Sequence, residues 1–88
     1  MTKCFLYILY SSQIDQYYIG ISHDPIKRLS YHNSYDKGWT KRGRPWILVF
    51  QKEFSCQSEA RHWEKKIKDQ KRKDIIEMII RNKFQWID

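Results

Sequence analysis

Residues 5–10 (FLYILY) and 17–21 (YYIGI) are two short runs of aromatic, β-branched and other apolar side chains, separated by the polar segment 11–16 (SSQIDQ). Both runs are apolar at even and odd positions alike, a pattern that favours strands covered on both faces. The polar connection is short enough for the two strands to pair as an antiparallel hairpin. The hairpin therefore predicts a sheet with helices on both sides.

The segment after the hairpin predicts a helix, a loop and a further strand. Asp24 followed by Pro25 is typical of an N-cap and a first helical position, and predicts a helix through about Asn33. Residues 34–45 (SYDKGWTKRGRP) contain glycines, a proline and several basic side chains, and are expected to form a basic loop rather than a regular element. Residues 46–54 begin with WILVF and predict a third strand.

The last third of the chain predicts two helices. Ser55 is expected to cap the first of them, and Ala60, Trp63 and Ile67 form its apolar stripe. A further helix is expected at about residues 71–81. The element order is then β-β-α-β-α-α, which predicts an α/β (α+β) fold: a small, three-stranded, mostly antiparallel sheet flanked by helices, with residues 1–88 as a single domain.

The composition favours a polyanionic partner. The chain has 88 residues, with 17 Lys and Arg against 10 Asp and Glu, and carries a net charge of +7. Such a charge suits binding to nucleic acid. The alternative is that the charge serves only to keep a small protein in solution. The two cysteines, Cys4 and Cys56, form no metal-binding or disulfide pattern, and no apolar run is long enough to span a bilayer. We expect a soluble, cytoplasmic protein with no membrane contact.

Several polar side chains of the predicted elements can meet at one place. If the hairpin pairs odd with even positions, as in a pairing of Tyr7 with Tyr18, both tyrosines project from the same face and Gly20 leaves a gap there. Arg28 and His32 are four positions apart and are therefore neighbours on the first helix.

Glu64 borders the apolar stripe of the second helix, where a carboxylate needs a cation. A structural ion pair with Arg28 is one expectation for it.

This pattern resembles the GIY-YIG nuclease superfamily over nearly the whole chain. Phe5-Leu6-Tyr7 stands where the first triplet of that family lies, and Tyr18-Ile19-Gly20 matches the second. The resemblance continues through residues 25–33 (PIKRLSYHN), Thr40 with Arg44-Pro45, and Glu59-Ala60 ahead of residues 64–68 (EKKIK). The most similar group consists of small stand-alone bacterial members related to the excision-repair nuclease amino-terminal domain and to structure-specific resolvase subunits.

The resemblance implies a metal-dependent DNA endonuclease with structure or strand preference, and hence a role in DNA repair. It implies that Glu64 holds one divalent ion, Mg²⁺ or Mn²⁺, and that Arg28 stabilises the phosphorane. Tyr7 or Tyr18 would orient or deprotonate the attacking water, with His32 as the competing base. Which residue is the base stays open. The implied catalytic residues are Tyr7, Tyr18, Arg28, His32 and Glu64.

The basic segments predict contacts with the nucleic-acid backbone. In the basic loop the candidate binding residues are Lys37, Trp39, Lys41, Arg42 and Arg44, with Trp39 available to stack on a base. The later basic run, residues 65–73, is either a solvated helix face or a second DNA surface.

Two other functions remain open from the sequence. One is a DNA- or RNA-binding module with little or no catalysis, acting with a partner protein. The other is an interaction protein whose charge is incidental.

Overall fold

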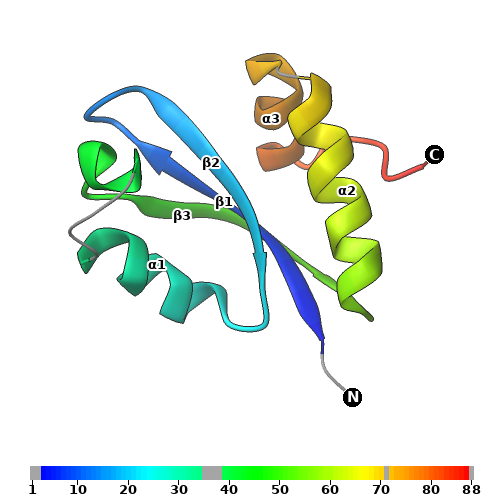
Figure 1. Ribbon diagram of the computed structural model, residues 1–88. Helices are drawn as coiled ribbons and strands as arrows, with labels where there is room; N and C mark the ends of the chain where they lie inside the picture. The colour runs from blue at the N-terminus through cyan, green and yellow to red at the C-terminus, as the bar shows by residue number, and fades with distance from the viewer. Residues whose placement is uncertain (1–2, 35–38, 71, 88) are drawn as a thin grey trace.

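The computed structural model describes residues 3–34, 39–70 and 72–87. Across these residues the elements follow the predicted order (Figure 1): β1 (Cys4–Ser11), β2 (Gln16–Ser22), α1 (Pro25–Ser34), the 3₁₀ helix η1 (Trp39–Gly43), β3 (Ile47–Phe54), α2 (Gln57–Gln70) and α3 (Lys73–Ile80). The described strands form one antiparallel sheet in the order β2-β1-β3. The predicted fold class and element order are confirmed.

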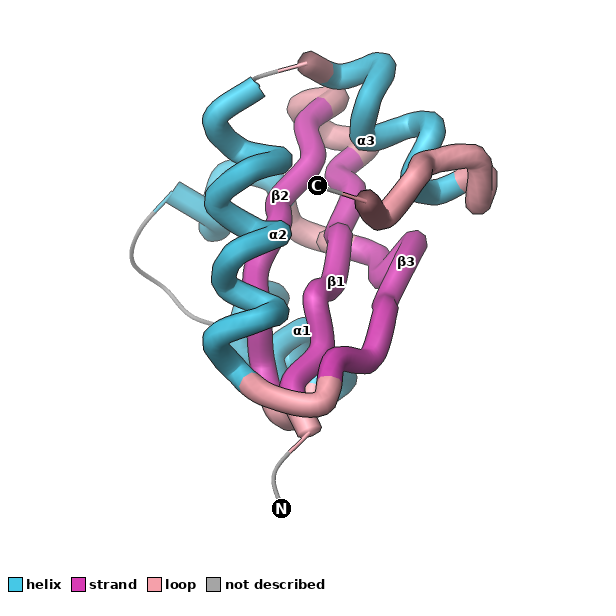
Figure 2. Tube along the Cα trace, turned by 90° about the vertical axis from the view of Figure 1, so that its right-hand side faces the viewer, coloured by secondary structure: helices cyan, strands magenta, loops and turns pink. Residues whose placement is uncertain are grey.

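The sheet is a central layer with helices on both faces. Figure 2 shows α2 and α3 on the viewer's side of the sheet and α1 beyond it. Because side chains alternate along a strand, each face of β1 supplies a different core. Leu6 and Ile8 pack with α2 and α3, whereas Tyr7 and Leu9 pack with Trp46 on the side of α1. The apolar run of residues 5–10 is thus explained by burial on both faces.

The hairpin register puts Tyr7 opposite Gly20 and Leu9 opposite Tyr18. Odd positions pair with even ones, as expected, but the partner of Tyr7 lies two residues beyond Tyr18. Tyr7, Tyr18 and Gly20 therefore share the face that packs against α1. The bend at the end of the hairpin includes Asp15, whose φ of 51° is a left-handed conformation that Asp adopts more readily than most residues.

The helix ends follow the sequence with some corrections. Asp24 caps α1 as predicted, since its Oδ1 accepts a hydrogen bond from the Lys27 backbone nitrogen at 3.1 Å. The second helix begins at Gln57, directly after Cys56, whose carbonyl accepts from Ala60; the expected cap at Ser55 is wrong by one residue. The segment expected to be a basic loop contains the η1 helix, which packs on α1.

The predicted apolar stripe of α2 is confirmed. Ala60, Trp63 and Ile67 of α2 are buried, as is Ile79 of α3. Phe84 and Trp86 pack back on this core, and the ring centroids of Trp63 and Trp86 lie 5.3 Å apart, edge to face. In the part of the chain described, no helix is both long and apolar enough to cross a membrane.

Gly20 is a position at which close packing on the α1 face of the sheet excludes a side chain. A Cβ added there would lie 2.6 Å from the Tyr7 hydroxyl and 2.7 Å from the ring carbon that bears it. No side chain can occupy that space while the Tyr7 ring keeps its place, because interiors are close-packed. The glycine therefore leaves room for the phenol of Tyr7 to lie across the backbone of β2.

Replacing Gly20 with alanine should lower the free energy of unfolding by about 1–3 kcal/mol, the usual cost of overpacking. Urea unfolding of Gly20→Ala would measure it. The matched control is the same substitution in a Tyr7→Leu background, where the shorter side chain removes the collision. There alanine should be neutral or stabilising, because glycine weakens a strand by about 0.5–1 kcal/mol. An equal loss in both backgrounds would contradict the steric explanation.

Candidate active site

The phenol of Tyr7 is the centre around which the other predicted residues gather. Tyr7 is 1% exposed and lies in the middle of β1, facing α1. Its hydroxyl lies 3.1 Å from His32 Nε2, within hydrogen-bond distance. The Arg28 guanidinium also hydrogen bonds to the phenol and tends to lower its pKa. Arg28 and His32 are neighbours on the helix, as the sequence predicted, and both side chains contact the same phenol.

Tyr18 forms the second wall of this site. Its ring centroid lies 6.3 Å from that of Tyr7 and 4.5 Å from that of His32. The imidazole is therefore held against Tyr18 while it contacts the hydroxyl of Tyr7. Tyr18 is half-buried, at the edge of the sheet. One tyrosine of the pair is thus enclosed, and the other is accessible to a substrate.

Arg28 lies half-buried at the rim and is held by two aromatic residues. Its guanidinium carbon is 4.8 Å from the centroid of the Tyr31 ring, a cation–π contact from the same helix. Its hydrogen bond to Tyr7 raises the pKa of the guanidinium further above its usual range. Arg28 is therefore a fixed positive charge beside the phenol.

His32 is buried and electrically neutral. Burial, followed by the positive charge of Arg28, lowers the pKa of the imidazole below its ordinary value of 6.5. Its Nδ1 is buried and has no hydrogen-bond partner among the described residues. A buried acceptor without a partner is less costly than a buried N–H donor in the same state, which favours the tautomer with the proton on Nε2. In that tautomer His32 donates its hydrogen bond to the oxygen of Tyr7.

The protein raises the pKa of Tyr7 above the ordinary value of 10. Burial is the largest cause, hydrogen bonding from Arg28 opposes it, and the neighbouring Tyr18 and the charge of Glu64 raise the pKa as well. Without further positive charge Tyr7 is therefore a neutral phenol near pH 7. A cation that neutralised Glu64 would remove one of the causes that keep the proton on Tyr7.

Glu64 approaches this site from the opposite face of the sheet. It lies on α2, which packs against β1 and β2, and its side chain is 15% exposed. Its Oε2 accepts from Lys68 Nζ at 3.2 Å, so the cation of Glu64 is Lys68 and the expected pair with Arg28 is wrong. Lys68 Nζ lies 5.7 Å from the centroid of the Tyr18 ring. Because Tyr18 faces α1, this contact passes round the outer edge of β2.

The donors at this place suit one hydrated Mg²⁺ or Mn²⁺ ion rather than a preformed metal cage. Among the residues that the structure describes, no group of three His, Cys, Asp or Glu side chains could enclose a metal ion. Glu64 offers hard carboxylate oxygens, and Mg²⁺ is commonly held by one or two carboxylates with waters and substrate phosphates. Glu64 fits that mode of binding once its ion pair with Lys68 is broken and its Oε2 is available to the metal ion.

The structure describes residues 39–45 of the predicted basic loop. Lys41 and Arg42 are exposed on η1, and Arg44 is half-buried and donates to the carbonyl of Asn33 at 3.3 Å. Trp39 begins η1. Lys37 lies outside the described residues.

Asn33 and Trp46 support the site and were not singled out as site residues from the sequence. The side chain of Asn33 donates to the Trp46 carbonyl at 3.0 Å and accepts from the Trp46 nitrogen at 2.6 Å. Trp46 is buried and its ring lies edge-on to Tyr18, with centroids 6.4 Å apart. The only sequence signal was the place of Asn33 directly after His32, which does not reveal a partner thirteen residues away.

Comparison with known proteins gives concordant matches. The family model described as the GIY-YIG catalytic domain matches residues 3–78. A UPF0213 protein of Staphylococcus haemolyticus is 36% identical over 81 residues, which cover 90% of this chain and 96% of the relative. The solution NMR structure of a UPF0213 protein of Bacillus halodurans is 31% identical, with a TM-score of 0.47 over 76% of this chain and 71% of the other.

The buried, neutral state of His32 predicts how stability depends on pH. A histidine whose pKa is lowered by folding binds its proton more readily in the unfolded chain, so stability rises with pH through that range. His32 therefore contributes fully above its ordinary pKa of 6.5, and its contribution is lost as the pH falls through the lower pKa of the folded state. Urea unfolding between pH 7.5 and 5 should show a smaller decline for His32→Gln than for the parent. The exposed His62, changed to Gln, is the control and should keep the parental slope; parallel curves for His32→Gln would refute the assignment.

Proposed function

Because the chain belongs to the GIY-YIG family of catalytic domains, a nuclease family, we propose that it is a metal-dependent endonuclease. Its substrate is DNA, in which it hydrolyses phosphodiester bonds with a preference for particular structures or strands. The observation that supports this most directly is the buried Tyr7 phenol, which has Arg28 and His32 at its oxygen and whose pKa is raised by the charge of Glu64 on the other side of the sheet.

The reaction needs positive charge, because a phosphodiester is anionic and repels an attacking hydroxide. Arg28 supplies a fixed charge at the rim of the site. Its planar guanidinium matches two phosphate oxygens at once, and its contact with Tyr31 limits its freedom to move. Arg28 therefore binds the scissile phosphate and stabilises the negative charge that grows on it during attack.

Tyr7 is the residue that we assign as the base. Its oxygen takes the proton of the attacking water when it is present as phenolate, and Arg28 and the Nε2–H of His32 hold that phenolate by hydrogen bonds. His32 is not assigned as the base, because its Nε2 is engaged with the Tyr7 oxygen and its Nδ1 is buried away from solvent. It acts instead as a neutral donor that positions the phenol, while Tyr18 borders the position of the substrate.

Glu64 is the residue that would hold the divalent ion. Bound there, Mg²⁺ or Mn²⁺ would lend positive charge to the phosphate and to the leaving 3′ oxygen, and would favour the phenolate of Tyr7. With the ion bound, Lys68 would no longer pair with Glu64 and would be available to the DNA backbone beside Tyr18. The exposed Lys41 and Arg42 of η1 are proposed to contact the same DNA farther from the reacting bond.

Substitution of Glu64 by glutamine should abolish cleavage that depends on Mg²⁺ or Mn²⁺. Glutamine keeps the size of the side chain and removes the charge that an ion needs. Labelled single-stranded, duplex, flap and branched DNA would be incubated with either metal, with a chelator as a second control. Glu59→Gln, an exposed change of the same kind on α2, should cut at the parental rate.

Equal cutting by Glu64→Gln and the parent would overturn the proposal. Absence of cutting by the parent, together with tight and salt-sensitive DNA binding, would favour a binding module on the same fold.

A further inference from the structure

A shallow groove runs along the outer edge of β2 and leads away from the site. It consists of two adjoining depressions of about 200 Å³ and about 230 Å³. Tyr17, Arg72 and Ile76 line both of them. The first also includes Asp15 and Lys73, and the second includes Tyr18 and Lys68. We call these two depressions the edge groove.

The edge groove connects the two faces of the sheet. Tyr17 and Tyr18 are adjacent in β2, so their side chains point to opposite faces. Tyr17 packs with the α2–α3 core and Tyr18 with the α1 core. Both can line one surface only because β2 is at the edge of the sheet. A ligand that leaves the catalytic site past Tyr18 can therefore continue round this edge to Tyr17.

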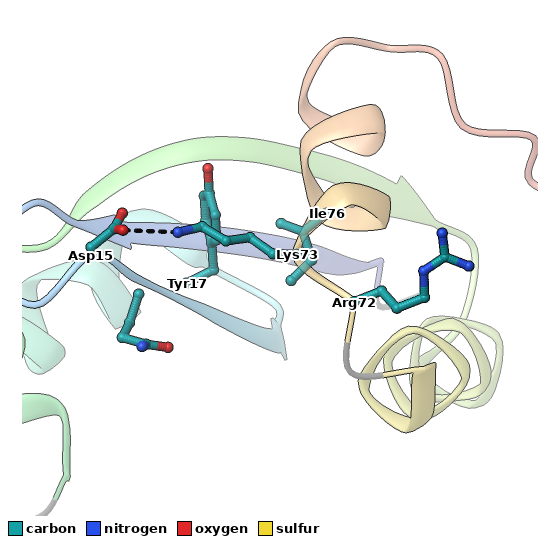
Figure 3. A pocket seen from close by; sticks show the side chains of 6 residues that line it. Asp15, Tyr17, Arg72, Lys73 and Ile76 are labelled. Carbon is teal, nitrogen blue, oxygen red and sulfur yellow. Dashed lines mark hydrogen bonds and ion pairs between the residues drawn. The ribbon is translucent and has the colours of Figure 1, made fainter.

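Aromatic rings and cations alternate along the edge groove. Lys68 Nζ lies 5.7 Å from the Tyr18 centroid, and Lys73 Nζ lies 5.8 Å from the Tyr17 centroid. Figure 3 shows the Lys73 side chain extending past Tyr17 toward Asp15, while the Arg72 side chain extends the opposite way from the start of α3. Lys73 therefore belongs to the first depression and Lys68 to the second, while Arg72 lines both.

Each of these cations already has an acidic partner. Lys73 pairs with Asp15 at 3.0 Å and Arg72 with Asp74 at 2.6 Å, and every side chain in these two pairs is about half exposed or more. Exposed pairs of this kind stabilise a protein by only about 0–1 kcal/mol. The phosphate backbone of a nucleic acid, which releases its counterions on binding, can therefore compete with Asp15 and Asp74 for these cations.

The shape and lining fit one strand of a nucleic acid better than a small ligand or a duplex. Both depressions are open to solvent, whereas a small-molecule pocket encloses most of its ligand. Stacking on tyrosine needs a base whose flat face is free, which an unpaired strand offers and the interior of a duplex does not. Lysine and arginine beside the rings suit the phosphates between successive bases.

We propose that the edge groove binds an unpaired DNA strand as it leaves the catalytic site, with bases against Tyr17 and Tyr18 and phosphates at Lys68, Arg72 and Lys73. This inference rests on the proposed nuclease function, which places the DNA in the catalytic site beside Tyr18. Under this proposal Lys68, Arg72 and Lys73 of the basic run 65–73 form a DNA surface, whereas Lys65 is exposed outside the groove.

Binding would be measured in the presence of a chelator, so that the result does not depend on cleavage. Fluorescence anisotropy would compare a labelled DNA hairpin that carries an unpaired tail with the same hairpin ending bluntly. The parent protein should bind the tailed hairpin about ten-fold more tightly, the scale of one stacked base. Tyr17→Leu, which keeps an apolar side chain and removes the ring, should lose most of that preference.

A charge-matched pair of double variants separates the groove from general charge. Arg72→Gln with Lys73→Gln should weaken binding of the tailed hairpin and reduce its salt slope by about 0.7 for each phosphate that the protein no longer neutralises. Lys65→Gln with Lys83→Gln removes the same charge from exposed positions outside the groove, and should affect both hairpins alike.

Equal affinity of the parent for the two hairpins, or equal effects of the two double variants, would overturn the proposal that the edge groove binds an unpaired strand. Metal-dependent cutting that needs Glu64 would still stand in that case. Conversely, a protein that prefers the tailed hairpin but does not cut DNA would support strand binding in the edge groove and refute the proposed nuclease function.

Discussion

The placement of the Tyr7 phenol across the backbone of Gly20 is the feature from which the geometry of the site follows. A side chain at residue 20 would collide with the hydroxyl of Tyr7, so the glycine is needed for that ring to lie as it does. From this position the oxygen reaches His32 Nε2 at 3.1 Å and the guanidinium of Arg28. The hairpin thus determines how the phenol lies across β2. The helix α1 supplies a fixed positive charge, Arg28, and a neutral donor, His32, at the phenol oxygen.

The position of β2 at the edge of the sheet lets side chains from the two faces meet. In a sheet with helices on both faces, side chains from opposite sides can meet only round an edge. Glu64 lies on the α2 side, and its partner Lys68 reaches Tyr18 on the α1 side. The proposed metal ligand and the proposed phenolic base are therefore supplied by different layers of the fold. The edge groove follows from the same arrangement, because it extends the meeting of the two faces along β2.

The sequence predicted the element order, the two-sided burial of the sheet and the shared face of Tyr7 and Tyr18, because period-two and helical patterns report burial directly. It also predicted that Arg28 and His32 would be neighbours, since that follows from helical spacing alone. It placed Tyr7 opposite the wrong residue of β2, because alternation fixes the face of a side chain but not the register. Partners from distant segments were beyond the sequence for a similar reason, since no periodicity reports the distance between them. The pairing of Glu64 with Lys68 instead of Arg28 depends on which layer carries α2.

The cleavage rate of Tyr7→Phe, compared with that of Tyr18→Phe, tests most directly whether the Tyr7 oxygen is the catalytic base. Phenylalanine keeps the buried ring and removes only the oxygen that Arg28 and His32 contact. We predict that Tyr7→Phe binds DNA normally in chelator but loses metal-dependent cleavage by at least about 10²-fold, the lower range for a lost acid–base group. Tyr18→Phe should lose less. Parental cleavage by Tyr7→Phe would contradict this role for the phenol.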